Sequence, residues 1–190
     1  MFQAYKTKVQ AWDPVTGNRD YVVTIENTSD VYAGGSQDNG TLLMANNGSA
    51  STAVDFGSGD GAATMFSKNP NNKYVVYNYV YNNAVSVLNM NNPSNDRSYW
   101  WRISSNDNNE GDFINKGALD SNLGIIYMSA NTGRVRAFHN WDDFAPGSQG
   151  TIKDTYLIEN LGSSITALTV SPFETQSSTL YAGNEVGQLF

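Results

Sequence analysis

Two carboxylates stand in glycine-rich stretches of the chain where short turns are expected. Asp38 lies in the run GGSQDNG at residues 34–40, and Asp60 is flanked by glycines in the run GDG at residues 59–61. Hydrolysis of a glycosidic bond uses two carboxyl groups about 5–10 Å apart, one as acid and the other as nucleophile or base. Both runs adjoin predicted strands of neighbouring repeats, so Asp38 and Asp60 could come together as such a pair.

The same two runs also have a simpler structural interpretation. An Asn-Gly pair favours a tight hairpin turn, so Asn39 and Gly40 predict a two-residue turn in which Gly40 has a positive φ. Asp38 would then accept hydrogen bonds from nearby backbone N–H groups, and Asp60 would bond its own loop. We favour this structural role, with catalysis by Asp60 and Asp38 as the alternative.

A binding role is the third interpretation of the first run. Gln37, Asp38 and Asn39 would present two amides and one carboxylate on one surface. These groups donate and accept hydrogen bonds, as recognition of sugar hydroxyls requires. The sequence therefore makes these three residues candidates for glycan contact.

Aromatic residues supply a candidate platform for the same ligand. Trp100 and Trp101 are adjacent, so on a strand they would point to opposite faces, and an exposed ring could hold a sugar or a partner protein. Packing inside the fold is the other interpretation of these two residues. Tyr77, Tyr79 and Tyr81 fall on one face of a predicted strand, and we interpret this ladder as packing.

Residues 107–112 carry a weak pattern for a metal site. Asp107, Asn109 and Asp112 offer oxygen ligands as at the start of a calcium loop, but no glutamate follows at the twelfth position. A solvated loop is therefore expected, and no cofactor. The chain has one histidine, His139, and no cysteine, so a zinc site lacks ligands and a histidine-based triad has a single possible base. His139 is interpreted as a residue at the edge of a sheet.

The composition indicates a turn-rich β protein and excludes several classes of function. The 190 residues include 24 Asn and 17 Gly, which both accept positive φ and so favour turns. A net charge of −7 disfavours binding to nucleic acid, whose recognition depends on basic residues. No apolar run approaches the roughly 18 residues that a membrane span requires.

An internal repeat organises the chain. Four segments share an apolar residue, a tyrosine, small residues, a turn and an alternating strand, and another short strand precedes each of them. This pattern predicts four-stranded units of roughly 40–50 residues, as in β-propeller blades whose first strands line a central channel. We therefore predict an all-β fold, a β-propeller fragment of about four four-stranded antiparallel blades. The repeated tyrosines are Tyr32, Tyr77, Tyr127 and Tyr181.

The same alignment sets the expected turns and boundaries. Residues that accept positive φ are expected at Asn39-Gly40, Asn82-Asn83 and Thr132-Gly133. Because a propeller must close into a ring to protect its edges, we expect one partial propeller domain, residues 1–190, of a longer chain that supplies the remaining blades. The expected units span residues 1–23 (partial), 24–60, 61–112, 113–162 and 163–190 (partial).

The run GGSQDNG, the later GDG and the run YAGNEVG at residues 181–187 resemble the sortilin-like and BNR-type propellers. Large secreted or surface proteins of Bacteroidota carry such propellers, in which a G-T/S-Q-D-N-G hairpin and a following G-G-D-G turn recur in neighbouring blades. The similarity covers roughly residues 31–190, although the chain contains no intact Asp-box of the form S-x-D-x-G-x-x-W.

The resemblance implies a secreted or cell-surface protein, often a substrate of type IX secretion. Its partners would be a glycan or cell-surface protein and the secretion machinery, with no nucleic acid among them. No complete catalytic constellation is present, so the expected function is that of a non-catalytic propeller segment in adhesion, glycan contact or scaffolding. The alternative is a fragment of a propeller glycoside hydrolase similar to the xyloglucanases, which place one catalytic Asp in each of two domains.

Overall fold

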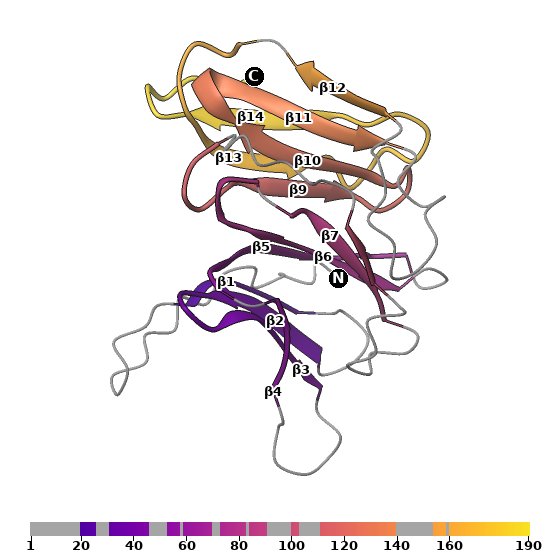
Figure 1. The fold of residues 1–190 in the computed structure, drawn as a ribbon. Coiled ribbons are helices and arrows are strands. Elements are labelled where there is room, and N and C mark those ends of the chain that lie inside the picture. The colour runs from indigo at the N-terminus through magenta and orange to yellow at the C-terminus, as the bar shows by residue number, and fades with distance from the viewer. Residues whose placement is uncertain are drawn as a thin grey trace.

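The chain forms a stack of small antiparallel β-sheets, as seen in the computed structural model (Figure 1). The sheets are meanders, because strands that follow one another in sequence also pair in space. The description covers residues 20–25, 31–45, 53–57, 59–69, 73–82, 84–90, 100–102, 111–139, 154–158 and 160–190.

The first two sheets contain four strands each, in sequence order. The first consists of β1 (Asp20–Ile25), β2 (Val31–Ser36), β3 (Gly40–Ala45) and β4 (Ala53–Gly57). The second consists of β5 (Gly61–Phe66), β6 (Tyr74–Tyr79), β7 (Ser86–Asn89) and β8 (Trp100–Arg102), with the short 3₁₀ helix η1 (Val80–Asn82) after β6.

The third sheet repeats this order and the fourth begins it. The third consists of β9 (Gly117–Asp120), β10 (Ile125–Ala130), β11 (Arg134–His139) and β12 (Asp154–Ile158), with the 3₁₀ helix η3 (Asn131–Gly133) between β10 and β11. The fourth pairs β13 (Ile165–Val170) with β14 (Leu180–Asn184), and Leu189 forms a further bridge to Gly183.

Burial between layers explains why the central strands are apolar on both faces. Every residue of β10 is buried, so the sequence IIYMSA does not alternate between apolar and polar residues. Residues 125 and 127 of β10 pack toward the fourth sheet, whereas residues 126 and 128 pack toward the second. This alternation is the period of two that a strand imposes on its side chains.

Three apolar clusters hold the four sheets together. The first and second sheets share a cluster that includes Ala33, Leu43 and Val75. The second and third share one that includes Val76 and Met128, and the third and fourth sheets share another around Val135, Ile165 and Ala182. Each inner sheet is thus covered on both faces, and no described sheet closes on itself.

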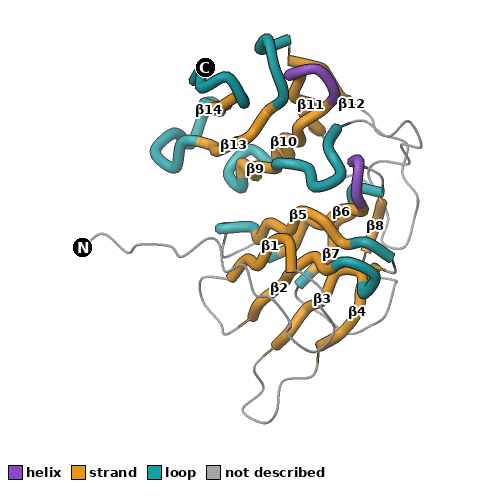
Figure 2. The backbone as a smooth tube through the Cα atoms, turned by 90° about the vertical axis from the view of Figure 1, so that its left-hand side faces the viewer, coloured by secondary structure: helices purple, strands orange, loops and turns teal. Residues whose placement is uncertain are grey.

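The first strands of successive sheets lie against one another. β1 contacts β5, β5 contacts β9, and β9 contacts β13. Figure 2 shows β1, β5 and β9 toward one side of the stack, with β4, β8 and β12 toward the other. The described parts of the fourth strands make no contact of similar extent with each other. The layers therefore meet along their first strands, and at the first junction β2 also contacts β5.

The predicted hairpins and their preceding strands are confirmed, and the chain is all-β with two very short 3₁₀ helices among the described residues. Each repeated tyrosine lies on the second strand of its sheet. β1 spans residues 20–25 and therefore crosses the expected boundary between residues 23 and 24.

The expected equivalence of the tyrosines is wrong in one respect, the face on which they lie. Tyr77 packs toward the first sheet with Ala33, whereas Tyr127 packs toward the fourth sheet with Ile165. A shift of one residue along a strand moves a side chain to the opposite face. Alignment on tyrosine therefore places the second and third repeats one residue out of phase.

Candidate functional site

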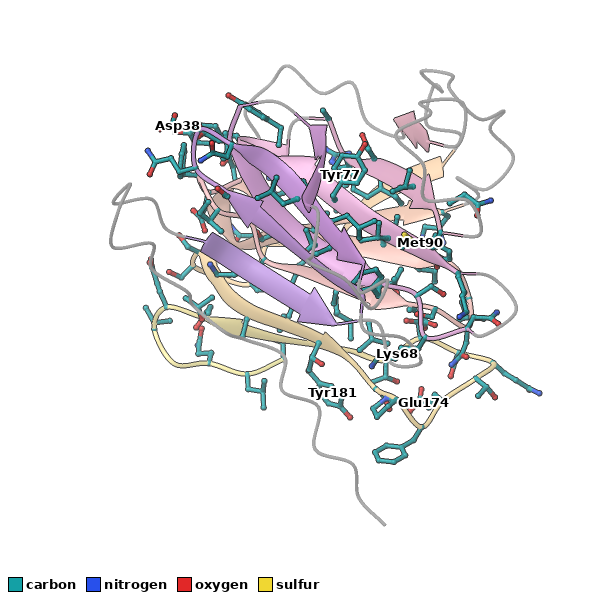
Figure 3. All side chains as sticks on the ribbon, turned by 90° about the horizontal axis from the view of Figure 1, so that it is seen from below. Asp38, Lys68, Tyr77, Met90, Glu174 and Tyr181 are labelled. Carbon is teal, nitrogen blue, oxygen red and sulfur yellow. The ribbon has the colours of Figure 1, made fainter. Side chains whose placement is uncertain are left out.

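One edge of the stack collects the turns between second and third strands together with the loops that lead into the first strands. We call it the hairpin edge; among the described residues it comprises residues 37–39, 59–60, 79–82, 84, 111–116, 131–133, 160–164 and 185–187, where Tyr79 is the last residue of β6. It contains Asp38, and Figure 3 shows Asp38 far from Glu174, which lies in the loop between β13 and β14. The sequence-predicted residues Gln37, Asp38, Asn39, Asp60 and Asp112 all lie on this edge.

A recurring hydrogen bond joins each sheet to the next along the hairpin edge. Gly40 N donates to the carbonyl oxygen of Gly59 at 2.6 Å, between the first and second sheets. Tyr81 N donates to the carbonyl oxygen of Phe113 at 3.4 Å, between the second and third. Leu161 N donates to the carbonyl oxygen of Gly133 at 2.8 Å, between the third and fourth. The turn of each sheet is therefore fixed to the loop before the next sheet.

The run GGSQDNG forms a three-residue hairpin turn. Ser36 pairs with Gly40 across β2 and β3, which leaves Gln37, Asp38 and Asn39 exposed at the tip. Gly40 has a φ of 73°, as predicted. The other residue of this turn with a positive φ is Asp38, at 62°, and not Asn39. The expected two-residue turn at Asn39-Gly40 is therefore wrong, because the register of β2 and β3 places three residues between the paired ends.

The other two predicted turns are those at Asn82-Asn83 and Thr132-Gly133. Only the second has its positive φ at a predicted residue. Gly133 has a φ of 71°, as expected. In the second sheet the positive φ values fall on Tyr81 (59°) and Ala84 (51°), while Asn82 does not have one and Asn83 lies outside the described residues. A left-handed conformation is unusual for a bulky aromatic residue such as Tyr81.

Asp60 fixes the tip of the first hairpin. Its Oδ1 accepts a hydrogen bond of 2.9 Å from the backbone N of Asp38. The sequence interpretation gave Asp38 the role of an acceptor for backbone N–H groups, whereas here Asp38 supplies the N–H and Asp60 supplies the carboxylate. This hydrogen bond joins residues 22 positions apart and so makes the two runs one structural unit.

Backbone contact explains two glycines of the same unit. A Cβ added to Gly35 would fall on the carbonyl oxygen of Ala62, and one added to Gly61 would fall on that of Gly40. The Cα of Gly35 would lie 2.8 Å from the Cβ at position 61. Only glycine allows strands of two sheets to approach this closely. Packing between the first and second sheets therefore requires one glycine in each run, Gly35 and Gly61, whereas Gly40 and Gly59 have a positive φ.

Three aromatic residues continue the hairpin edge from the second sheet to the third. Tyr79 is 38% exposed, and its ring lies against Gly59, where an added Cβ would come within 2.8 Å of Cε2. The rings of Tyr81 and Phe113 pack edge to face, with centroids 5.4 Å apart and planes at 77°. Phe113 is 37% exposed. Asp38, Asp60, Tyr79, Tyr81 and Phe113 thus follow one another across three sheets.

The sequence pattern did not predict that these aromatic residues are at the surface, because it indicates packing for the tyrosines. The predicted ladder holds for Tyr77, which is buried near Gly57, and for Tyr79, which lies near Gly59 two residues further on. The ladder does not extend to Tyr81, because β6 ends at Tyr79 and the 3₁₀ helix η1 begins at Val80. No feature of the sequence signalled Phe113, which packs on Tyr81 from the neighbouring sheet.

The remaining predicted residues do not join this group within the described structure. Trp100 and Trp101 lie on β8, where their backbones pair with Leu88 and Val87, and their side chains lie outside the description. Asp107 and Asn109 also lie outside it. Among the described residues, no group of three His, Cys, Asp or Glu side chains could hold a metal ion. His139 ends β11 opposite Asp154 of β12 and is half-buried.

Comparison with known proteins does not assign the chain to a family. No family model matches it, and no curated protein is significantly similar to it in sequence. In the described part of the chain, no helix is both long enough and apolar enough to pass through a membrane.

Proposed function

We propose that the chain is a non-catalytic β-propeller segment of an exported cell-surface protein, of the sortilin-like or BNR type, that acts in adhesion, glycan contact or as a scaffold. Support for propeller geometry comes from consecutive antiparallel meanders that pack face to face, with their first strands in successive contact. First strands that converge in this way are what blades around a common axis require. The remaining blades of a longer chain would complete the ring.

The role of Asp60 is the single observation that favours binding over catalysis. Its carboxylate is a structural acceptor for the turn at Asp38. A catalytic acid or nucleophile must instead face the substrate together with a second carboxyl group at a fixed spacing. Asp60 and Asp38 are joined through a backbone N–H, which accounts for their proximity without any catalytic role.

Export and surface location rest on the resemblance of the QDNG and GDG runs to propellers of secreted Bacteroidota proteins. A surface role suits a hairpin edge whose turn tips, Gln37 to Asn39, are exposed and polar. The expected partners are a glycan or a surface protein, and the type IX secretion machinery during export. Protease treatment of intact cells tests the location, because an exported protein is degraded without lysis.

A hydrolysis assay separates the proposal from its alternative. The full-length protein is incubated with β-glucans and xyloglucan, and the release of reducing ends is measured for the wild type and for Asp60→Asn. We expect no turnover by either protein. Turnover that Asp60→Asn abolishes, with an unchanged melting temperature, would establish the xyloglucanase-like alternative and overturn the non-catalytic assignment.

A further inference from the structure

We propose that the aromatic section of the hairpin edge, formed by Tyr79, Tyr81 and Phe113, is a binding surface for an uncharged saccharide. The inference rests on the proposed function, which it deepens by naming the ligand class and the residues that hold it. These residues differ from the tryptophans that the sequence offered as a platform. Tyr79 also connects them to the polar turn 37–39, because its ring lies against Gly59, next to the Asp60 that accepts the N–H of Asp38. That turn can bind the same ligand.

The geometry of the rings suits a sugar. Tyr81 and Phe113 stand nearly at right angles, at 77°, and together form an aromatic corner in which Phe113 is 37% exposed. A pyranose has an apolar face of C–H groups that stacks on an aromatic ring, and equatorial hydroxyls that project from its rim. Tyrosine adds a phenolic hydroxyl to an apolar ring, so it serves both parts of such a ligand.

The backbone conformation of Tyr81 is a second observation that supports a binding site here. Its φ of 59° and ψ of 31° put a bulky aromatic residue in the left-handed region, which costs free energy and persists only when the surroundings enforce it. The result is that Tyr81 leaves the ladder of Tyr77 and Tyr79 and meets Phe113 in the next sheet. The strained backbone of Tyr81 therefore both joins the two sheets and places an aromatic corner at the surface, where a ligand can reach it.

Charge selects the kind of saccharide. The described residues of the hairpin edge contain four carboxylates, Asp38, Asp60, Asp112 and Glu185, and one cation, Lys116, whose Nζ donates a hydrogen bond to the carbonyl oxygen of Ile114. Carboxylates near the rings repel sialic and uronic acids, whereas they accept hydrogen bonds from neutral hydroxyls. The excess of acidic residues in the chain, with a net charge of −7, acts in the same direction. The ligand is therefore a neutral sugar.

The test measures binding of defined oligosaccharides to the full-length protein. Neutral probes are hexaoses of β-1,4-glucose, β-1,3-glucose, β-1,4-mannose and β-1,4-xylose, and acidic probes are a sialylated trisaccharide and a tri-galacturonate. Calorimetry or ligand-observed NMR gives the affinity for the wild type and for Tyr79→Ala, Tyr79→Phe and Phe113→Ala. We expect at least one neutral hexaose to bind, and no acidic probe to bind more tightly.

Both alanine variants should lose about tenfold or more in affinity, whereas Tyr79→Phe keeps the ring and stays within about threefold of the wild type. Phe173→Ala and Tyr181→Ala are the matched controls, because both aromatic side chains are exposed, at 86% and 44%, and neither belongs to the hairpin edge. Melting curves accompany every variant, and if Tyr79→Ala unfolds, Phe113→Ala decides.

Three outcomes overturn the inference: no neutral hexaose binds, an acidic probe binds best, or the alanine variants bind as tightly as the controls. Capture of a protein or peptide without any sugar would also overturn it, while leaving the proposed non-catalytic function intact. Conversely, hydrolysis of a bound neutral sugar would refute the proposed function and leave the saccharide surface standing.

Discussion

The hairpin edge contains two different kinds of junction. The first joins the first sheet to the second, and the second joins the second sheet to the third. At the first junction the contact is made by backbone: Gly35 and Gly61 allow the strands to touch, and Asp60 receives the N–H of Asp38. At the second junction the contact is made by side chains, because Tyr81 packs on Phe113 and the backbone hydrogen bond there is long, at 3.4 Å.

This difference separates two ways of joining repeats. Where Gly35 and Gly61 meet the opposite backbone, the junction leaves no room for a Cβ, so its specificity there comes from glycine. The turn beside it carries exposed side chains such as Gln37. A side-chain junction tolerates replacement of one apolar group by another, and it leaves part of its rings on the surface. The first junction is therefore suited to holding the sheets, and the second to presenting a surface.

The largest expected effect comes from adding a methyl group, by substitution of glycine with alanine, at the junction between the first and second sheets. Gly61→Ala places a Cβ on the carbonyl oxygen of Gly40, so we expect a loss of about 3 kcal/mol in the free energy of unfolding. Gly183→Ala is the control, since its new Cβ would lie no nearer than 3.7 Å to Ala167 and should cost less than about 0.5 kcal/mol. Urea unfolding measures both, and equal losses would contradict the backbone junction.

The turn of the same junction gives the next largest effect. Gly40→Val introduces a β-branched residue at a φ of 73°, so we expect a loss of more than about 1 kcal/mol. Gly40→Asn should cost clearly less, because asparagine tolerates the left-handed conformation. The two melting temperatures decide the matter, and a valine variant as stable as the asparagine variant would show that φ is not the constraint.

Removal of the Asp60 carboxylate should have a smaller effect. Asp60→Ala deletes the acceptor for Asp38 N in a partly exposed site, and a loss of about 1 kcal/mol is expected. Asp60→Asn retains an oxygen acceptor and should stay within about 0.5 kcal/mol of the wild type. Chemical unfolding of both variants checks this, and destabilisation of the same size in each would mean that charge, not the hydrogen bond, matters.

The side-chain junction should give the smallest effect. A double-mutant cycle with Tyr81→Leu and Phe113→Leu isolates the ring pair, and we expect a coupling of about 0.5–1 kcal/mol in the free energy of unfolding. Each leucine keeps apolar contact, so the single variants should remain folded. Additive losses, with no coupling, would remove the contrast between the two junctions.

Much of the fold could be predicted because strands and hairpins are local. Alternation, Asn-Gly chemistry and the repeat located the hairpins around Gly40 and Gly133, and the positive φ of both glycines. The partner of each turn could not be predicted, because the contact of Asp38 with Asp60 depends on how two sheets stack. The contact of Tyr81 with Phe113 could not be predicted for the same reason, because the two residues belong to different sheets. In addition, η1 ends the two-residue period of the preceding strand.

The opposite orientation of Tyr77 and Tyr127 has a consequence for protein design. A consensus repeat could be made by superimposing the four tyrosines. It would average side chains that pack against the preceding sheet, as Tyr77 does, with side chains that pack against the following sheet, as Tyr127 does. Copies of such an averaged unit would present core side chains to the wrong neighbouring layer. A tandem array that stacks should instead be averaged in the register in which Val76 superimposes on Tyr127, because both of these side chains look toward the following layer.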